Sequence, residues 1–106
     1  MGGFALSTRH DGATSIISIH GDLDMAAAPI LLTAGTDELA SISCELVVLD
    51  LTGLEFLDST GLGCWVELHK RATGLGKTLR IQNLRDDARR IVDIGGLSML
   101  FELDAS

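Results

Sequence analysis

Four consecutive residues, Asp58-Ser59-Thr60-Gly61, carry the strongest chemical signal in this sequence because they join an apolar loop to a predicted helix. Asp58 or Ser59 is placed to cap that helix by accepting hydrogen bonds from its first free N–H groups, a role worth about 1 kcal/mol. The start of a helix is also a favourable place for a phosphate dianion. On the residues alone, a cap and a functional hydroxyl are both open readings of Ser59.

Two glycines in the first turn favour a role beyond capping. Gly61 and Gly63 each cost about 1 kcal/mol of helix propensity relative to alanine. Because they have no side chains, another protein or a nucleotide can approach the neighbouring hydroxyl closely. On the residues alone, a binding site at this helix start and a simple cap remain equally open.

Fragments typical of enzymes do not extend into complete motifs. The run Gly76-Lys77-Thr78 resembles the end of a phosphate-binding loop, but Arg71 stands where that loop needs a glycine. No serine has the G-x-S-x-G surroundings of a hydrolase nucleophile. The histidines show no metal-ligand spacing on a shared helix: His10, His20 and His69. We expect no enzyme, no metal site and no cofactor; a small serine hydrolase using Ser59 is the least favoured alternative.

Length, charge and cysteine content bound the class of protein. The 106 residues provide for one domain, predicted over 1–106, and the net charge of −7 would repel nucleic acid. No apolar run approaches the roughly 20 residues that span a bilayer, and no secretory signal is present. Cys44 and Cys64 form no CxxC pair and are expected to be free thiols. The predicted location is the cytoplasm, away from the membrane.

The apolar periodicity predicts alternating strands and helices that position these residues. We predict strands at 4–8, 15–20, 45–51, 78–82 and 99–103, helices from 25–29 to 42, from 59 to 75 and from 84 to 94, and a loop over 52–58. Strand 45–51 is apolar on both faces, as at the centre of a parallel sheet. Crossovers between parallel strands are right-handed, so strands added steadily in one direction place every helix on the same face of the sheet. The predicted fold is α/β: a two-layer arrangement with a mixed, mostly parallel sheet and helices on one face.

Two predicted helices carry an apolar stripe that should face the sheet. The first stripe consists of Ala28, Leu31, Leu32, Gly35, Leu39 and Ile42, and the second of Leu62, Trp65, Leu68, Ala72 and Leu75. Trp65 is expected to be buried between its helix and the sheet. In the loop over 52–58, Phe56 and Leu57 are apolar and should attach the loop to the core. Asn83 is placed to cap the third helix.

Three segments resemble the STAS domain, in particular the bacterial anti-sigma factor antagonists. The run Gly21-Asp22-Leu23-Asp24 resembles the family's "G-x-L-D" motif, and "LVVLDLTGLEFLDSTGLG" at 46–63 is similar to its central signature. The run "ARRIVDIGGLSMLFEL" at 88–103 is similar to the family's third helix and last strand. The resemblance covers nearly the whole chain and implies the STAS-type fold.

The resemblance also implies a site and a partner. In that family the serine after the loop aspartate is phosphorylated by a partner that is both kinase and anti-sigma factor. This role falls on Ser59, with Thr60 as a second candidate acceptor and with Asp24 and Asp58 near the site. Because the kinase must reach the hydroxyl, Ser59 is expected to be at least partly exposed at the start of the second helix. Partner contacts are expected to extend along the first turn to two further residues: Gly61 and Leu62.

The implied function is partner switching. The unphosphorylated form would bind the anti-sigma factor serine kinase and release the sigma factor, and a PP2C-type phosphatase would reset the phosphorylated form. Two alternatives within the family are a STAS subunit of a lipid transporter and a stress-signalling scaffold. A carboxylate-rich site with an added phosphate would lose partner affinity through repulsion and desolvation.

Overall fold

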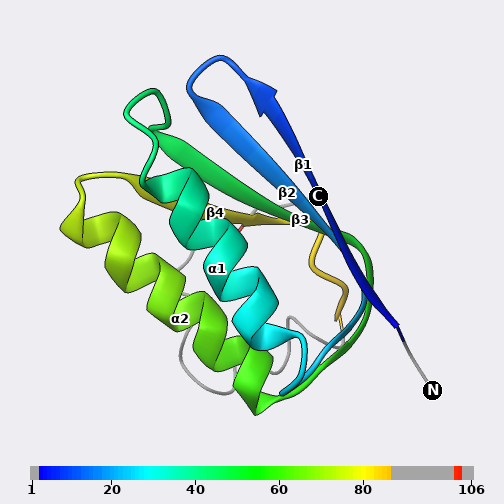
Figure 1. Cartoon of the computed structure of the whole chain (residues 1–106). Coiled ribbons are helices and arrows are strands. Elements are labelled where there is room, and N and C mark those ends of the chain that lie inside the picture. Colours follow the sequence, from blue (N-terminus) through cyan, green and yellow to red (C-terminus); the bar gives the residue numbers. More distant parts are fainter. Residues whose placement is uncertain (1–2, 87–101, 104–106) are drawn as a thin grey trace.

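The computed structural model describes residues 3–86 and 102–103, which form a sheet with two helices packed on it (Figure 1). The elements in chain order are β1 (Phe4–Asp11), β2 (Thr14–Leu23), α1 (Ala28–Leu39), β3 (Leu46–Leu57), α2 (Ser59–Gly74), β4 (Thr78–Gln82) and β5 (Glu102–Leu103). Most of the predicted third helix, 84–94, lies outside the described residues.

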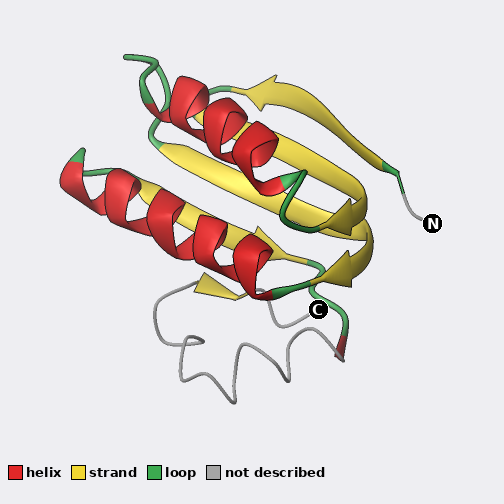
Figure 2. Cartoon of the chain, turned by 60° about the horizontal axis from the view of Figure 1, so that its bottom comes forward, coloured by secondary structure: helices red, strands yellow, loops and turns green. Residues whose placement is uncertain are grey.

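The sheet and its cover confirm the predicted architecture. The strand order is β1-β2-β3-β4-β5; β1 and β2 are antiparallel, and each later pair is parallel. Both α1 and α2 cover the same face of the sheet, as Figure 2 shows. Ile17 and Ile19 on β2 are fully buried beneath them, while His20 is exposed. The alternation of apolar and polar residues therefore assigned the two faces of β2 correctly.

The first hairpin is longer than the predicted strands at 4–8 and 15–20. Its turn consists of Gly12 and Ala13, so pairing runs up to Asp11 opposite Thr14. Gly12 adopts a φ of +60°, a conformation that a residue without Cβ reaches at little cost. At its other end β2 continues to Leu23, which lies opposite Leu57 of β3.

The predicted loop over 52–58 is wrong, because β3 continues through these residues to Leu57. Two register shifts let β3 follow β2 over this length, one between Ser18 and His20 and one between Gly21 and Asp22. Leu57 does reach the core, but Phe56 is 52% exposed and anchors nothing. Sequence periodicity stopped the strand too early because bulges break strict alternation.

Helix α1 ends at Leu39 rather than near Ile42. The amino group of Lys77, just before β4, donates hydrogen bonds to the carbonyl oxygens of Leu39 and Ser41. These bonds satisfy carbonyl groups that the end of a helix leaves without a partner. The chain then leaves the helix, and Ile42 is fully exposed instead of continuing the apolar stripe.

Helix α2 buries the centre of its predicted stripe but not its end. Trp65, Leu68 and Ala72 are buried, whereas Leu75, beyond the last helical residue, is 57% exposed. The two helices approach closely at Gly35, where an added Cβ would lie 2.7 Å from a Leu68 methyl carbon. The glycine therefore sets the spacing of the helical layer.

Both cysteines are buried free thiols, as predicted. Burial raises the pKa of Cys64 to about 11, so its thiol stays protonated at neutral pH. Its Sγ donates to the carbonyl oxygen of Ala28 at 3.5 Å, which joins α2 to the start of α1. Cys64 thus serves packing rather than reactivity.

The side chain of Asn83, the predicted cap of the third helix, contacts Asp50 on β3. Its Nδ2 donates to Oδ1 of Asp50 at 2.9 Å, and its φ is +60°. Burial raises the pKa of Asp50, but the hydrogen bonds from Asn83 and Thr52 outweigh burial and hold it below its usual value. The helix that Asn83 was expected to cap falls largely within 87–94, outside the described residues.

Candidate functional site

The carboxyl ends of β2 and β3 bring Asp24 and Asp58 to the same edge of the sheet. Leu23 and Leu57 are the last residues of these parallel strands and lie opposite each other. Each is followed directly by an aspartate. Asp58 then leads straight into α2, and Asp24 leads into a turn at 25–27 that precedes α1. The sheet therefore places the two aspartates at the same end of neighbouring strands, as the family resemblance implied for Asp24.

Asp58 caps α2 and leaves Ser59 outside the capping interaction. The Asp58 Oδ1 accepts hydrogen bonds from the backbone N–H groups of Thr60 (2.9 Å) and Gly61 (3.0 Å). Ser59 is the first residue of the helix, and it is exposed together with Thr60. This settles the choice between the two candidate caps in favour of Asp58 and confirms that Ser59 is accessible.

Gly61 has a different role from the one predicted. It is buried, and an added Cβ would lie 2.7 Å from the carbonyl oxygen of Leu23 and 2.8 Å from Leu57 Cδ1. The missing side chain lets α2 start against the ends of both strands. Gly63, in contrast, is exposed, and an added Cβ would meet nothing within 4 Å. Of the two glycines, Gly63 is the one that leaves open space for a partner, and Leu62 beside it is half-buried.

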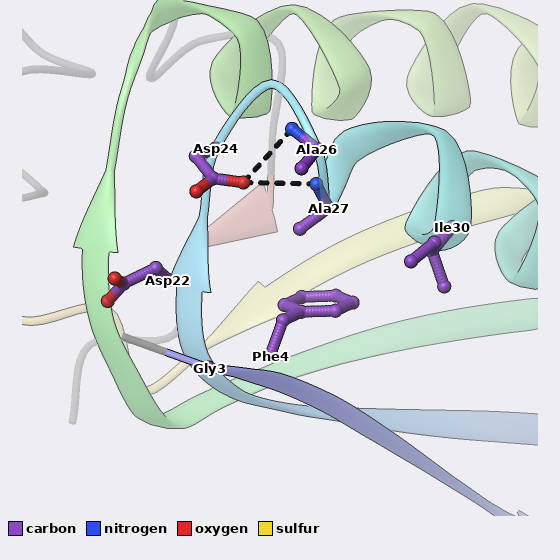
Figure 3. Close-up of a pocket in the computed structure, with 7 residues that line it drawn as sticks. All are labelled: Gly3, Phe4, Asp22, Asp24, Ala26, Ala27 and Ile30. Atoms are coloured by element: carbon purple, nitrogen blue, oxygen red, sulfur yellow. Dashed lines mark hydrogen bonds between the residues drawn. The ribbon is translucent and has the colours of Figure 1, made fainter. Parts of the chain in front are cut away.

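Asp24 caps the turn at 25–27 that leads into α1, a role that was not predicted from the sequence; α1 itself has Ala27 at its N-cap position and no side-chain cap. Its Oδ1 accepts hydrogen bonds from the N–H groups of Ala26 (3.1 Å) and Ala27 (3.0 Å), as Figure 3 shows. Its carbonyl oxygen accepts from Ala27 and Ala28. The available signal was an aspartate a few residues before Pro29, which occupies the first turn of α1. Asp24 thus fixes the turn between β2 and α1 and displays its second carboxylate oxygen at the site.

A shallow depression of about 250 Å³ adjoins Asp24 (Figure 3). Its lining combines acidic and apolar side chains with bare backbone: Gly3, Phe4, Asp22, Asp24, Ala26, Ala27 and Ile30. Ile30 is 55% exposed, and Met25, next to Asp24 in the chain, is 72% exposed. Exposed apolar residues beside acidic ones are typical of a protein-binding surface. Periodicity could not single them out, because it finds apolar residues that face the core.

Two other kinds of site find no support in the described part of the chain. No three His, Cys, Asp or Glu side chains gather there to hold a metal ion. Neither α1 nor α2 is long and apolar enough to span a membrane. What the described site offers is an exposed hydroxyl, two capping carboxylates and an apolar rim.

This combination of fold and site is shared with a known family. The family model described as "Mlab, STAS domain" matches residues 6–104, so the chain belongs to the STAS domain family. The resemblance drawn from the sequence motifs is confirmed.

The relatives of the chain are regulatory proteins. It is 32% identical over 89 residues to the anti-sigma-B factor antagonist of Bacillus subtilis, covering 84% of this chain and 80% of that protein. It is 25% identical over 92 residues to the anti-sigma F factor antagonist of Paenibacillus polymyxa, covering 87% and 79%. The crystal structure of an anti-sigma factor antagonist from Mycobacterium paratuberculosis superposes with a TM-score of 0.85 at 25% identity, covering 98% and 87%.

These comparisons confirm the family and the fold. The names of these three relatives are those of regulators, and none of them is the name of an enzyme. The role of each site residue rests on the geometry described above.

Proposed function

We propose that this protein is an anti-sigma factor antagonist whose unphosphorylated form binds a serine-kinase anti-sigma factor and so releases the sigma factor. Phosphorylation of Ser59 switches it off, with Thr60 as the second candidate acceptor. The names of the curated relatives support the antagonist function. The observation that carries the switch is the exposed Ser59 at the first position of α2, next to a helix cap supplied by Asp58 rather than by the serine itself.

The proposed switch is electrostatic. A phosphate on Ser59 adds a charge of about −1.5 to −2 at neutral pH, beside Asp58 and at the same sheet edge as Asp24. The Asp58 carboxylate already accepts from the N–H groups of Thr60 and Gly61, so these donors are not available to the phosphate. The new charge therefore faces the partner. Each loss of about 1.4 kcal/mol in binding free energy lowers affinity tenfold.

The proposed partner surface comprises residues on both helix starts. Gly61 holds the first turn of α2 in place. The contacts come from polar side chains and from one half-buried apolar one: Asp24, Asp58, Ser59, Thr60 and Leu62. The exposed side chains of Met25 and Ile30 extend this surface along α1. A PP2C-type phosphatase would act on the same exposed serine, and the whole cycle would take place in the cytoplasm without nucleic acid or membrane.

Phosphorylation by a purified candidate kinase tests the proposal. The protein is incubated with the kinase and ATP, and the phosphate is mapped by mass spectrometry in parallel with a Ser59→Ala variant. Phosphate on Ser59, lost in the variant, supports the switch. Phosphate outside Ser59 and Thr60 would refute it. Copurification with a membrane ATPase instead of a kinase would point to the transporter-subunit alternative.

A further inference from the structure

Strand β1 forms one edge of the sheet, and its outer side has no neighbour among the residues that the structure describes (Figure 1, Figure 2). It is 8 residues long, Phe4–Asp11, and pairs with β2 without a register shift. Edge strands are usually blunted by proline, lysine, a bulge or short length. β1 has no proline, lysine or bulge, and its charged residues, Arg9 and Asp11, lie toward one end. Its outer side is therefore a long, regular template for another strand.

The pairing with β2 tells which backbone groups point outward. The N–H of Asp22 donates to the carbonyl oxygen of Gly3 at 2.9 Å, so Gly3 faces β2. Hydrogen-bonded and non-hydrogen-bonded pairs alternate along antiparallel strands. The residues that direct their N–H and C=O groups away from β2 are therefore the alternate ones: Phe4, Leu6, Thr8 and His10.

We propose that β1 pairs with β1 of a second copy of this chain, antiparallel, about a two-fold axis that passes at Ser7. In this register Phe4 of one copy bonds with His10 of the other, and Leu6 bonds with Thr8. All outward-facing residues of β1 then have a partner. A register shifted by two residues leaves either Phe4 or His10 unpaired, depending on the direction of the shift. A shift by one residue would place the helices of the two copies on opposite faces of the sheet, and a two-fold axis normal to the sheet keeps them on the same face.

The side chains fit the same register. On the face away from the helices, Ser7 of one copy lies opposite Ser7 of the other, and Ala5 of one copy lies opposite Arg9 of the other. No like charges therefore meet. The paired stretch contains Arg9 but no acidic residue, because Asp11 falls beyond the overlap. Although the chain carries a net charge of −7, its repulsion is therefore not concentrated at this edge. On the helix side, the half-buried Phe4 and Leu6 would lose further contact with water.

The two-fold axis also determines where the Ser59 sites lie. It reverses the strand direction between copies, so the carboxyl ends of β2 and β3 point to opposite ends of a continuous sheet. Both sites stay accessible, and the pairing does not depend on the proposed function. One pair of strands buries a small area, so the dimer should be weak and concentration-dependent.

Disulfide cross-linking tests the register. Opposed residues of a non-hydrogen-bonded pair have Cβ atoms about 4.5–5.5 Å apart, close to what a disulfide needs. We expect Ser7→Cys to form a covalent dimer rapidly under mild oxidation. Arg9→Cys, at a position that is also exposed on the same face, should react much more slowly because it lies opposite Ala5. The unsubstituted chain, whose Cys44 and Cys64 are buried, sets the background. Equal rates for the two variants, or faster linking of Arg9→Cys, would overturn the proposal.

Sedimentation equilibrium tests the dimer itself. Thr8→Pro removes an outward N–H group while leaving the bonds to β2 in place, and proline is tolerated on the solvent side of edge strands. The unsubstituted chain and Thr8→Ala should show a monomer–dimer equilibrium, and Thr8→Pro should weaken it at least tenfold with an unchanged circular dichroism spectrum. A chain that stays monomeric from micromolar to millimolar concentration would refute the pairing.

Discussion

At the scale of single residues, the cap of α2 and the proposed phosphorylation site are two different residues, Asp58 and Ser59. Because Asp58 caps the helix, Ser59→Ala should leave the free energy of unfolding within about 0.5 kcal/mol of the parent, as for surface substitutions away from caps. The variant should bind its partner constitutively. Ser59→Glu should weaken binding only partly, because a carboxylate brings one charge rather than nearly two. Isothermal titration against the partner measures both effects; tight binding by Ser59→Glu would contradict the electrostatic switch.

Asp24 combines a cap with a charge, and two substitutions separate these roles. Asp24→Ala removes the acceptor for the Ala26 and Ala27 N–H groups and should lower the free energy of unfolding by about 1 kcal/mol. Asp24→Asn keeps an acceptor and should cost much less. Urea denaturation gives the stability of each variant. If partner affinity falls equally in both, the charge and not the turn is what the partner recognises.

The glycine pair in α2 offers a matched comparison. Gly61→Ala should destabilise the protein by about 1–3 kcal/mol, because its Cβ would meet the backbone oxygen of Leu23, which cannot move aside cheaply. Gly63→Ala has open space and should stabilise the helix by up to about 1 kcal/mol. Thermal unfolding of both variants tests this. Similar effects at the two positions would mean that the close approach at Gly61 is not a constraint.

At the scale of elements, the connection between Lys77 and the end of α1 joins segments far apart in the sequence. Lys77→Met keeps the apolar stem but removes the hydrogen bonds to Leu39 and Ser41, and should cost about 1–2 kcal/mol. Lys70→Met, on the exposed face of α2, serves as the control and should change little. Hydrogen exchange at the end of α1 should accelerate in the first variant alone.

Much of the element order could be predicted from the sequence because apolar periodicity reflects which face of each element is buried. Trp65, Leu68 and the two faces of β2 were predicted on this basis. The end of α1 could not be, since Lys77 lies far along the chain. The extension of β3 was missed because two bulges in β3 itself interrupt its alternation.

The residues of the candidate site could be predicted from the sequence, but the role of each one could not. The residues Asp58-Ser59-Thr60-Gly61 were identified from their types and spacing alone. The division of labour among them was not, because it depends on contacts with β2. Gly61 was predicted to leave the backbone accessible to a partner. The structure shows that Leu23 already occupies the space where a side chain of residue 61 would lie. Asp24 was placed near the site by the family resemblance, but its hydrogen bonds to the turn before α1 could be seen only in the structure.

At the scale of the whole molecule, Glu38 links the hairpin to the helical layer. A hydrogen bond from Ser15 lowers its pKa most, burial opposes this, and His10, with Nε2 at 2.6 Å from Oε1, lowers it further. A carboxyl whose pKa is lower when folded stabilises the protein above its unfolded pKa, and this stability is lost as pH falls through the folded value. Glu38→Gln should therefore lower the unfolding temperature at neutral pH.

The sign of this effect gives a direct check. The difference in unfolding temperature between the parent and Glu38→Gln should shrink as the pH falls below the usual glutamate value of 4.5. Asp37→Gln, at the neighbouring exposed position, controls for the loss of a negative charge. A gap that stays constant from neutral to acid pH would show that Glu38 contributes through shape and not through its ionisation.

The turn at Gly12 and Ala13 lies at the amino end of β2, whereas Ser59 follows the carboxyl end of β3, which runs parallel to it. The connections that lead into β2, β3 and β4 thus lie at the opposite end of these strands from Ser59. An epitope or a fluorescent reporter inserted at this turn would be carried a full strand length away from the serine. An insertion at this turn should therefore allow the protein to be followed in living cells without reaching the proposed phosphorylation site.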